Sequence, residues 1–162
     1  MKYIDKHLTQ NEQVILTAKV SFKSLIAPII VFLFFSLFGI SLIVFTLSNK
    51  TVVMSNLYIG LGIISIGLIF LIERIVCVMG IVLAVTNKKI IGKIGVFSVK
   101  TMDTPIEKVN TVSVQQNLFQ RLLGYGRIAI TSSSGSYNFS SIKNYDEIRS
   151  AIMDQIEILK NE

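Results

Sequence analysis

The stretch NLFQRLLGYGRIAI, residues 117–130, combines three local signals that decide how this part of the chain folds. Asn117 is a good helix N-cap, and Gln120 stands three positions later, as in a capping box. Gly124 stands where the end of a helix favours a left-handed residue. The letters RIAITS that follow are typical of a β-strand. We therefore predict a short helix that ends at a glycine and leads into a strand.

The GYG triplet inside this stretch also occurs in potassium-channel filters, and GYGRIA fits the nucleotide pattern G-x-G-x-x-A. A filter lies between membrane helices, whereas this triplet comes well after the apolar segments, and Arg121 and Arg127 would repel cations. A nucleotide loop needs a strand before it and a helix after it, and here the order is reversed. We interpret the triplet as a joint in which Gly126 lets the chain turn and Tyr125 covers the turn.

The predicted short helix has one apolar face, formed by Leu118, Phe119, Leu122 and Leu123. We predict that this face packs into the core of a folded domain. The alternative is that it presses into a lipid bilayer, with Arg121 at the level of the headgroups.

Two long apolar segments precede this region. Residues 24–49 and residues 51–72 contain no charged side chain, and Lys50 stands between them. A helix needs ~20 apolar residues to cross a hydrocarbon core of ~30 Å. The segments therefore predict two transmembrane helices, at about residues 25–47 and 52–72, joined as a hairpin.

This hairpin divides the chain into an N-terminal arm (1–23), a membrane segment (24–72) and a soluble domain (73–162). Lysine and arginine accumulate on the cytoplasmic side of membrane proteins. Basic residues precede the first apolar segment and follow the second, whereas Lys50 alone lies in the connection. We therefore predict an integral, multi-pass protein of the cytoplasmic membrane with both termini in the cytoplasm.

Small residues predict close packing of the two helices. Gly60 and Gly67 share one face of the second helix, and Ser36 and Gly39 share a face of the first. Small side chains let helix backbones approach closely in lipid. We predict packing within the hairpin, and self-association between chains is the alternative.

Short runs rich in Val and Ile, separated by Gly, Asn, Ser and Lys, follow residue 73 and predict antiparallel strands. Residues 126–142 predict a hairpin with its turn near Gly135. The single cysteine, Cys77, lies in an apolar run, so we expect it to be buried.

The end of the chain predicts an amphipathic helix. Asn144 and Glu147 have the spacing of a capping box. The residues that follow place one apolar stripe on a helical face, namely Ile148, Ile152, Ile156 and Leu159. We predict that this stripe packs against the sheet. A helix on the membrane surface is the alternative, although its polar face is mixed in sign.

The candidate binding residues are basic, namely Lys88, Lys89, Lys93, Arg121 and Arg127. Anionic lipid attracts such residues by ~1 kcal/mol each, so they are candidate contacts to lipid headgroups or to a protein partner. A solvated turn explains the three lysines equally well. From Glu73 onward eleven Lys and Arg stand against eight Asp and Glu, and the basic stripe at residues 88–93 is short and lacks aromatic interleaving, so we expect no nucleic-acid partner.

The sequence contains no catalytic motif. The only histidine lies in the arm, and there is no HExxH, no Cys/His cluster and no P-loop. We therefore expect no enzyme, no cofactor and no metal, and a protein that works by binding.

Several motifs together carry a resemblance to a known family. They are LTQNEQVI (8–15), TNK (86–88), TPIEKV (104–109) and VSVQQNLFQRLLGYGRIAI (112–130), with Gly95 between them. In these motifs, and in the apolar hairpin, the chain resembles the bacterial pleckstrin-homology-like (PH-like) domain of small membrane proteins.

The resemblance implies a membrane helical hairpin plus a mostly-β, α+β domain: a strongly bent sandwich of about seven strands capped by a C-terminal α-helix. It does not imply phosphoinositide binding, because the fold hosts many ligands. We expect a membrane-tethered scaffold or accessory module that contacts another membrane protein, through an exposed sheet edge. The alternative is a sensor of anionic lipid or envelope stress that uses Lys88, Lys89 and Lys93.

Overall fold

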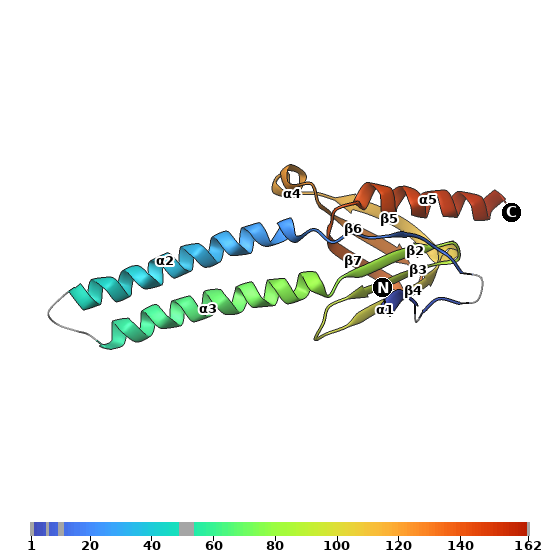
Figure 1. Cartoon of the computed structure of the whole chain (residues 1–162). Helices are drawn as coiled ribbons and strands as arrows, with labels where there is room; N and C mark the ends of the chain where they lie inside the picture. Colours follow the sequence, from blue (N-terminus) through green and yellow to red (C-terminus); the bar gives the residue numbers. More distant parts are fainter. Residues whose placement is uncertain (1, 6, 10–11, 49–53, 162) are drawn as a thin grey trace. The chain divides into compact units, whose positions relative to one another are not determined.

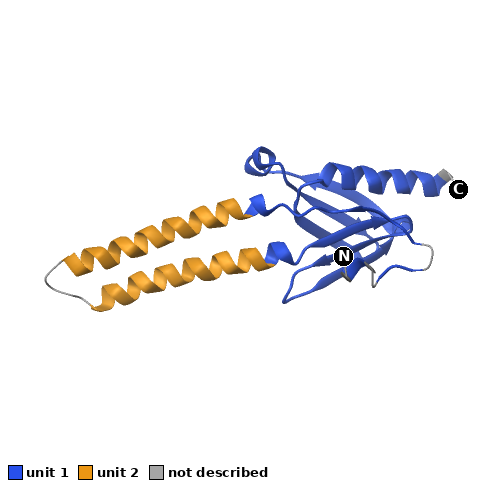
Figure 2. Cartoon of the chain, in the orientation of Figure 1, with its two compact units in different colours: residues 1–24, 77–162 blue, residues 25–76 orange. Residues whose placement is uncertain are grey.

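The computed structural model describes residues 2–5, 7–9, 12–48 and 54–161. The chain divides into two compact units, one made of residues 1–24 and 77–162 and the other of residues 25–76 (Figure 2). We call them the sandwich unit and the helical unit.

The helical unit consists of two long apolar helices, α2 (Ile26–Ser48) and α3 (Met54–Met79), the last residues of α3 belonging to the sandwich unit. Each is long and apolar enough to cross a membrane. Pro28 falls in the first turn of α2, where its missing N–H is tolerated. Helix α3 does not end at residue 72, but continues through Glu73 and Arg74 to Met79.

Two glycines bring the backbones of α2 and α3 together. A Cβ atom on Gly39 would lie 2.8 Å from the carbonyl oxygen of Gly60, and one on Gly60 would lie 2.9 Å from that of Gly39. A Cβ atom on Gly67 would lie 3.3 Å from side-chain atoms of Phe32 and Phe35. Gly39, Gly60 and Gly67 thus face the partner helix of the same chain, which confirms the predicted packing within the hairpin.

The sandwich unit contains seven strands in two antiparallel sheets (Figure 1). The first sheet has the order β1 (Val14–Thr17), β2 (Val82–Thr86), β3 (Lys89–Ile94), β4 (Lys100–Pro105). The second has the order β5 (Val109–Gln115), β6 (Gly126–Ser132), β7 (Gly135–Ile142).

Four short helical elements complete the description: α1 (Lys2–Asp5), η1 (Phe22–Leu25), η2 (Ile106–Lys108) and α4 (Leu118–Leu123). The C-terminal helix α5 (Tyr145–Asn161) lies over the strands. The predicted fold class is confirmed, and so is the β6–β7 hairpin with its turn before Gly135.

Strand β1 comes from the N-terminal arm. It pairs antiparallel with β2, with Val14 opposite Thr86 and Thr17 opposite Ala84. Since β1 precedes the two long helices and β2 follows them, the helical hairpin occupies the connection between the first two strands of the sheet. The arm is therefore part of the sandwich and not a separate segment.

One core fills the sandwich. Ile128 and Ile130 of β6 and Phe139 of β7 are fully buried, and Ile148 and Ile152 of α5 pack against the same cluster. Ile156 and Leu159 continue this contact and are partly buried. The predicted packing of the C-terminal helix on the sheet is thus confirmed.

Gly92 makes room for the largest side chain in this core. A Cβ atom on Gly92 would lie 2.4 Å from the Cζ atom of Phe139. The absent side chain in β3 lets the ring of Phe139 reach across from the other sheet.

One local expectation is overturned. Cys77 is exposed on the surface of α3, so the prediction that it is buried is wrong. The apolar run around it predicted a strand, but in a helix only one side of that run faces inward.

The side chain of Asn144 binds the N-terminal arm. It accepts a hydrogen bond from the backbone N–H of Lys19 at 2.7 Å and donates one to the carbonyl of Thr17 at 3.2 Å. The capping box with Glu147 stays a prediction.

Candidate functional site

The two ends of the sandwich unit differ in chemistry. At one end the chain leaves for the long helices after Ser24 and returns at Cys77. We call this the exit end, and the opposite end, which contains the β2–β3 and β6–β7 turns, the turn end.

Helix α4 lies at the exit end. Val20, next to the point where the chain leaves, forms a bridge with Ile142 at the end of β7. The backbone N–H of Ser21 donates to the carbonyl of Ser141 at 2.7 Å. Ile142 pairs with Gly126 at the start of β6, and α4 immediately precedes that strand.

The turn between β3 and β4, residues 95–99, lies at the same end. A Cβ atom on Gly80, which follows α3, would lie 2.6 Å from the carbonyl carbon of Gly95. Gly95 has φ +90°, a conformation that favours glycine. The tight approach of these two glycines fixes the turn beside the returning chain.

The local structure of α4 follows its sequence. Asn117 and Gln120 form the predicted capping box, and Gly124 ends the helix with φ 72° and ψ 42°. Tyr125 is buried, and its carbonyl accepts a hydrogen bond from Nε2 of Gln116 at 2.9 Å. The predicted helix, glycine stop, covered joint and strand are confirmed.

The role of Gly126 differs from the expectation. It has no positive φ, but is the buried first residue of β6. A Cβ atom there would lie 3.1 Å from the ring of Tyr145 and 3.2 Å from the side chain of Gln116. The glycine is needed for close packing under α5 and not for a turn.

The apolar face of α4 is not in the core. Leu118, Phe119 and Leu122 are 85, 78 and 84% exposed, so the prediction that they pack into the domain is wrong. The core beneath is already closed by α5, whose Ile148 and Ile152 are fully buried. A six-residue helix held by its two caps is left projecting from the end of the sandwich.

The 95–99 turn carries a second exposed apolar group. Phe97 is 91% exposed, and Val96 and Val99 are 49 and 47% exposed. These side chains come from the first sheet, whereas α4 connects strands of the second. The exit end therefore presents two apolar protrusions, one from each sheet.

The five candidate basic residues do not form one patch. Lys88 and Lys89 lie in and next to the β2–β3 turn, at the turn end. Lys93 lies four residues further along β3, about 13 Å away at 3.3 Å per residue. Arg121 on α4 and Arg127 near the start of β6 are exposed at the exit end.

Two of these lysines have defined partners. Nζ of Lys89 lies 3.1 Å from a carboxylate oxygen of Asp103 and 3.8 Å from one of Glu12. Nζ of Lys93 lies 5.3 Å from the centre of the Tyr3 ring, which is within the range of a cation–π contact. These three partners could not be predicted from the sequence, because Glu12 and Tyr3 come from the arm and Asp103 comes from a neighbouring strand.

Glu12 links the arm to the sheet. Its carboxylate accepts hydrogen bonds from the backbone N–H and hydroxyl of Thr9, at 2.8 and 2.7 Å, and from the hydroxyl of Thr86, at 2.6 Å. Burial alone would raise the pKa of Glu12, but the bonds from Thr86 and Thr9 and the charge of Lys89 together outweigh it. The pKa therefore lies below its ordinary value of 4.5.

A shallow, open pocket of about 260 Å³ lies at the turn end. It is lined by Asp103, Thr104, Pro105, Lys108, Ser133 and Ser134. Its walls are partly polar and partly apolar, and it lies between the end of β4 and the β6–β7 turn. Among the described residues, no group of three or more His, Cys, Asp or Glu side chains could hold a metal ion.

The comparisons with known proteins agree with this architecture. The family model described as a bacterial PH domain matches residues 24–156. No curated protein and no solved structure matches the chain. The matched range includes the helical hairpin and all strands from β2 onward, while β1 lies before it.

Proposed function

The chain belongs to the bacterial PH domain family, and from this premise we propose that it is a membrane-tethered scaffold. The helical hairpin holds the sandwich at the inner face of the cytoplasmic membrane, where the sandwich binds another membrane protein as an accessory subunit. The proposal involves binding rather than catalysis, as is general for PH-like domains.

The observation that carries the proposal is the place of the hairpin within the fold. η1 ends at Leu25 and α2 begins at Ile26, while α3 ends at Met79 and β2 begins at Val82. The sandwich is thus attached to the apolar helices by two chain connections, neither of which has a long linker. A tether of this kind raises the effective concentration of the sandwich for partners in the same membrane.

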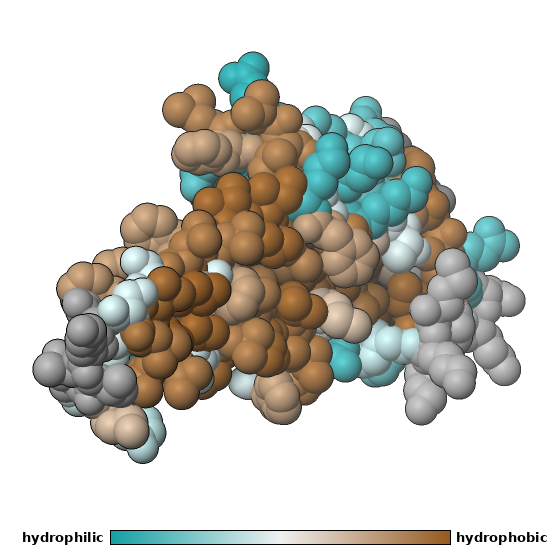
Figure 3. All heavy atoms as spheres, turned by 60° about the vertical axis from the view of Figure 1, so that its left-hand side comes forward, coloured by the Kyte–Doolittle hydropathy of each residue, from teal (hydrophilic) through white to brown (hydrophobic). Residues whose placement is uncertain are grey.

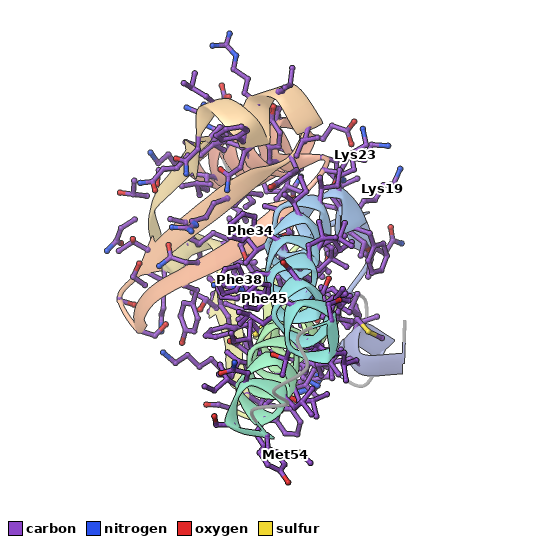
Figure 4. The ribbon with its side chains drawn as sticks, turned by 90° about the vertical axis from the view of Figure 1, so that its left-hand side faces the viewer. Lys19, Lys23, Phe34, Phe38, Phe45 and Met54 are labelled. Atoms are coloured by element: carbon purple, nitrogen blue, oxygen red, sulfur yellow. The ribbon has the colours of Figure 1, made fainter. Side chains whose placement is uncertain are left out.

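The surface of the helices supports a lipid environment. Phe34, Phe38 and Phe45 lie along one side of α2 (Figure 4) and are 70, 54 and 67% exposed. Together the long helices present a broad hydrophobic surface (Figure 3). So large an apolar surface is not stable in water, and the hydrocarbon core of a bilayer would cover it.

Flanking charge supports the orientation. Lys19 and Lys23 are exposed just before α2 (Figure 4), and Arg74 follows the apolar part of α3. The connection between the helices carries Lys50 alone. By the positive-inside rule, this distribution favours a cytoplasmic position for both termini and the sandwich.

The partner surface that we propose is the outer edge of β4 together with the turn end. β4 is the last strand of its sheet, and its outer edge pairs with no other strand in the described part of the chain. A strand at such an edge can pair with an extended segment of another protein. Lys88 and Lys89 lie at the turn end, where β4 ends, and are candidate contacts to the partner.

Site-specific photocrosslinking of the full-length protein in its native membrane tests the proposal. A photoreactive residue at Thr101 or Asp103, both exposed on β4, is expected to capture a membrane protein. The matched control is Asp154, exposed on α5, which is expected to capture none. Equal capture from both strand and helix, or from neither, would contradict the proposed edge.

Reporter fusions test the orientation separately. Reporters at Lys50 and Glu162 are expected to be active on opposite sides of the membrane, with the Glu162 reporter in the cytoplasm. A Glu162 reporter that is active only outside the cytoplasm would refute the proposed topology.

A further inference from the structure

We propose that α4 and the 95–99 turn insert into the lipid interface and hold the exit end of the sandwich against the bilayer. Phe97, Leu118, Phe119 and Leu122 enter the boundary between headgroups and acyl chains. This inference rests on the proposed membrane tether and adds a second, peripheral contact to it.

The first reason is exposure. Four large apolar side chains that project from two separate segments are 78 to 91% exposed, although the core of the same unit is fully closed. Single exposed apolar residues are ordinary, but gathered ones mark an interaction surface. The apolar face of α4 and the tip of the 95–99 turn therefore each need a cover that the sandwich itself does not provide.

The second reason is position. Hydrogen bonds and strand pairing place α4 beside Val20 and Ser21, and packing of Gly80 on Gly95 places the 95–99 turn beside the returning chain. Phe22, in the short helix that leads into α2, is itself 64% exposed. The apolar span begins at this residue, so a bilayer crossed by the helices ends close to the exit end.

The third reason is charge. Neither residues 92–102 nor residues 108–130 contain Asp or Glu, while Lys93, Lys100, Arg121 and Arg127 lie within them near the exit end. An interfacial segment combines apolar side chains with basic ones that reach the headgroups. Anionic headgroups attract such basic residues. This combination favours a lipid surface over a second copy of this basic chain, which would bring like charges together.

The absence of tryptophan from the chain allows a direct test. Phe97→Trp and Phe119→Trp each place a single tryptophan at one protrusion, where an exposed side chain tolerates exchange. The full-length variants are reconstituted into vesicles of phosphatidylcholine and phosphatidylglycerol, with the phosphatidylcholine brominated either near the carbonyl or near the end of the acyl chain. We expect blue-shifted emission at both positions, quenched most by the shallow bromines.

Two further variants separate this inference from the proposed tether. Phe38→Trp, in the middle of α2, is expected to be quenched most by the deep bromines. Ser133→Trp, exposed at the turn end, is expected to emit as in water and to escape quenching. If Phe38→Trp escapes quenching, the tether itself fails.

If Phe38→Trp is quenched but neither protrusion is, the tether stands and the interfacial contact is refuted. Blue-shifted emission at a protrusion without bromine quenching would show that protein covers it, and this also overturns the inference. Quenching of Ser133→Trp equal to that at the protrusions would remove the distinction between the two ends and refute it as well.

Discussion

Glu12→Gln is expected to destabilise the sandwich unit although it changes a single functional group. Glu12 is buried, and its two carboxylate oxygens accept hydrogen bonds from Thr9 and Thr86. A glutamine of the same shape can accept at only one end, because its other end is a donor. One donor of the network therefore loses its carboxylate acceptor and must find another partner.

The expected loss of stability depends on which other hydrogen-bond or ion-pair partners the neighbours of Glu12 keep in the variant. The hydroxyl of Thr86 can also donate to the carbonyl of Lys89, at 2.8 Å, so it keeps an acceptor. Lys89 keeps its contact to Asp103 at 3.1 Å. The net loss is thus close to one charge-assisted hydrogen bond, about 1.5–3 kcal/mol of the free energy of unfolding.

Urea unfolding of the full-length protein in detergent, followed by tyrosine fluorescence, measures this loss. The matched control is Asp103→Asn, which removes the other carboxylate near Lys89. The side chain of Asp103 is 46% exposed, so its ion pair contributes only about 0–1 kcal/mol. A Glu12→Gln variant no less stable than Asp103→Asn would refute the reasoning.

The same network predicts the direction of a pH effect. The pKa of Glu12 in the folded chain lies below its ordinary value of 4.5, so the unfolded chain binds this proton more readily. The contribution of Glu12 is therefore fully present above the unfolded pKa and is lost as the pH falls through the folded pKa. The stability difference between the wild type and Glu12→Gln should shrink as the pH falls below about 4.5. A difference that stays constant down to pH 3 would contradict this assignment.

Three further substitutions probe the packing of the sandwich, with the same unfolding measurement. Gly92→Ala should cost about 1–3 kcal/mol, because its Cβ atom would overlap the ring of Phe139, 2.4 Å away. Gly126→Val should also destabilise the unit, because its Cβ atom would press on the ring of Tyr145 at 3.1 Å and its methyl groups need still more room. Ile152→Ala should cost about 2–5 kcal/mol, because it opens a cavity at a fully buried position of α5.

Each of these three substitutions has a control variant or a result that would contradict the prediction. Met153→Ala, at the exposed neighbour of Ile152, should change the stability little, and an equal loss at both positions would count against the assigned face of α5. Gly124→Ala meets no neighbouring atom but has φ +72°, so its cost should be smaller, about 1 kcal/mol. Wild-type stability of Gly92→Ala or Gly126→Val would show that the neighbouring ring moves freely.

Short-range sequence patterns predicted correctly those elements whose structure depends on residues close together in the chain. The caps of α4 and the apolar stripe of α5 depend on residues three or four positions apart, and both are found where they were predicted. The β6–β7 hairpin likewise depends on one turn.

Contacts between distant segments could not be predicted in the same way. β1 has four residues without polar alternation, and its partner β2 begins some 65 positions later, so nothing in the arm marks it as a strand. Two motifs of the resemblance, LTQNEQVI and TNK, prove to touch: Glu12 bonds to Thr86, and the backbone N–H of Gln13 donates to Oδ1 of Asn87 at 3.0 Å.

The hydrophobic periodicity of residues 118–123 could not predict that the apolar face of α4 is exposed, and the reason is different. An apolar face shows that a helix buries one side, but not whether protein or lipid covers it. In the structure α5 already covers the core, so the core has no room for Leu118 and Phe119.

The insertion of the helical hairpin between β1 and β2 has a consequence for biosynthesis. β1 leaves the ribosome before the helices, and its partner strand follows them. If the first helix crossed the membrane and the second did not, the two strands would lie on opposite sides of the bilayer and could not pair. In the proposed topology the two strands meet on one side only when both helices cross together, so pairing of β1 with β2 excludes a chain in which just one of the two helices has inserted.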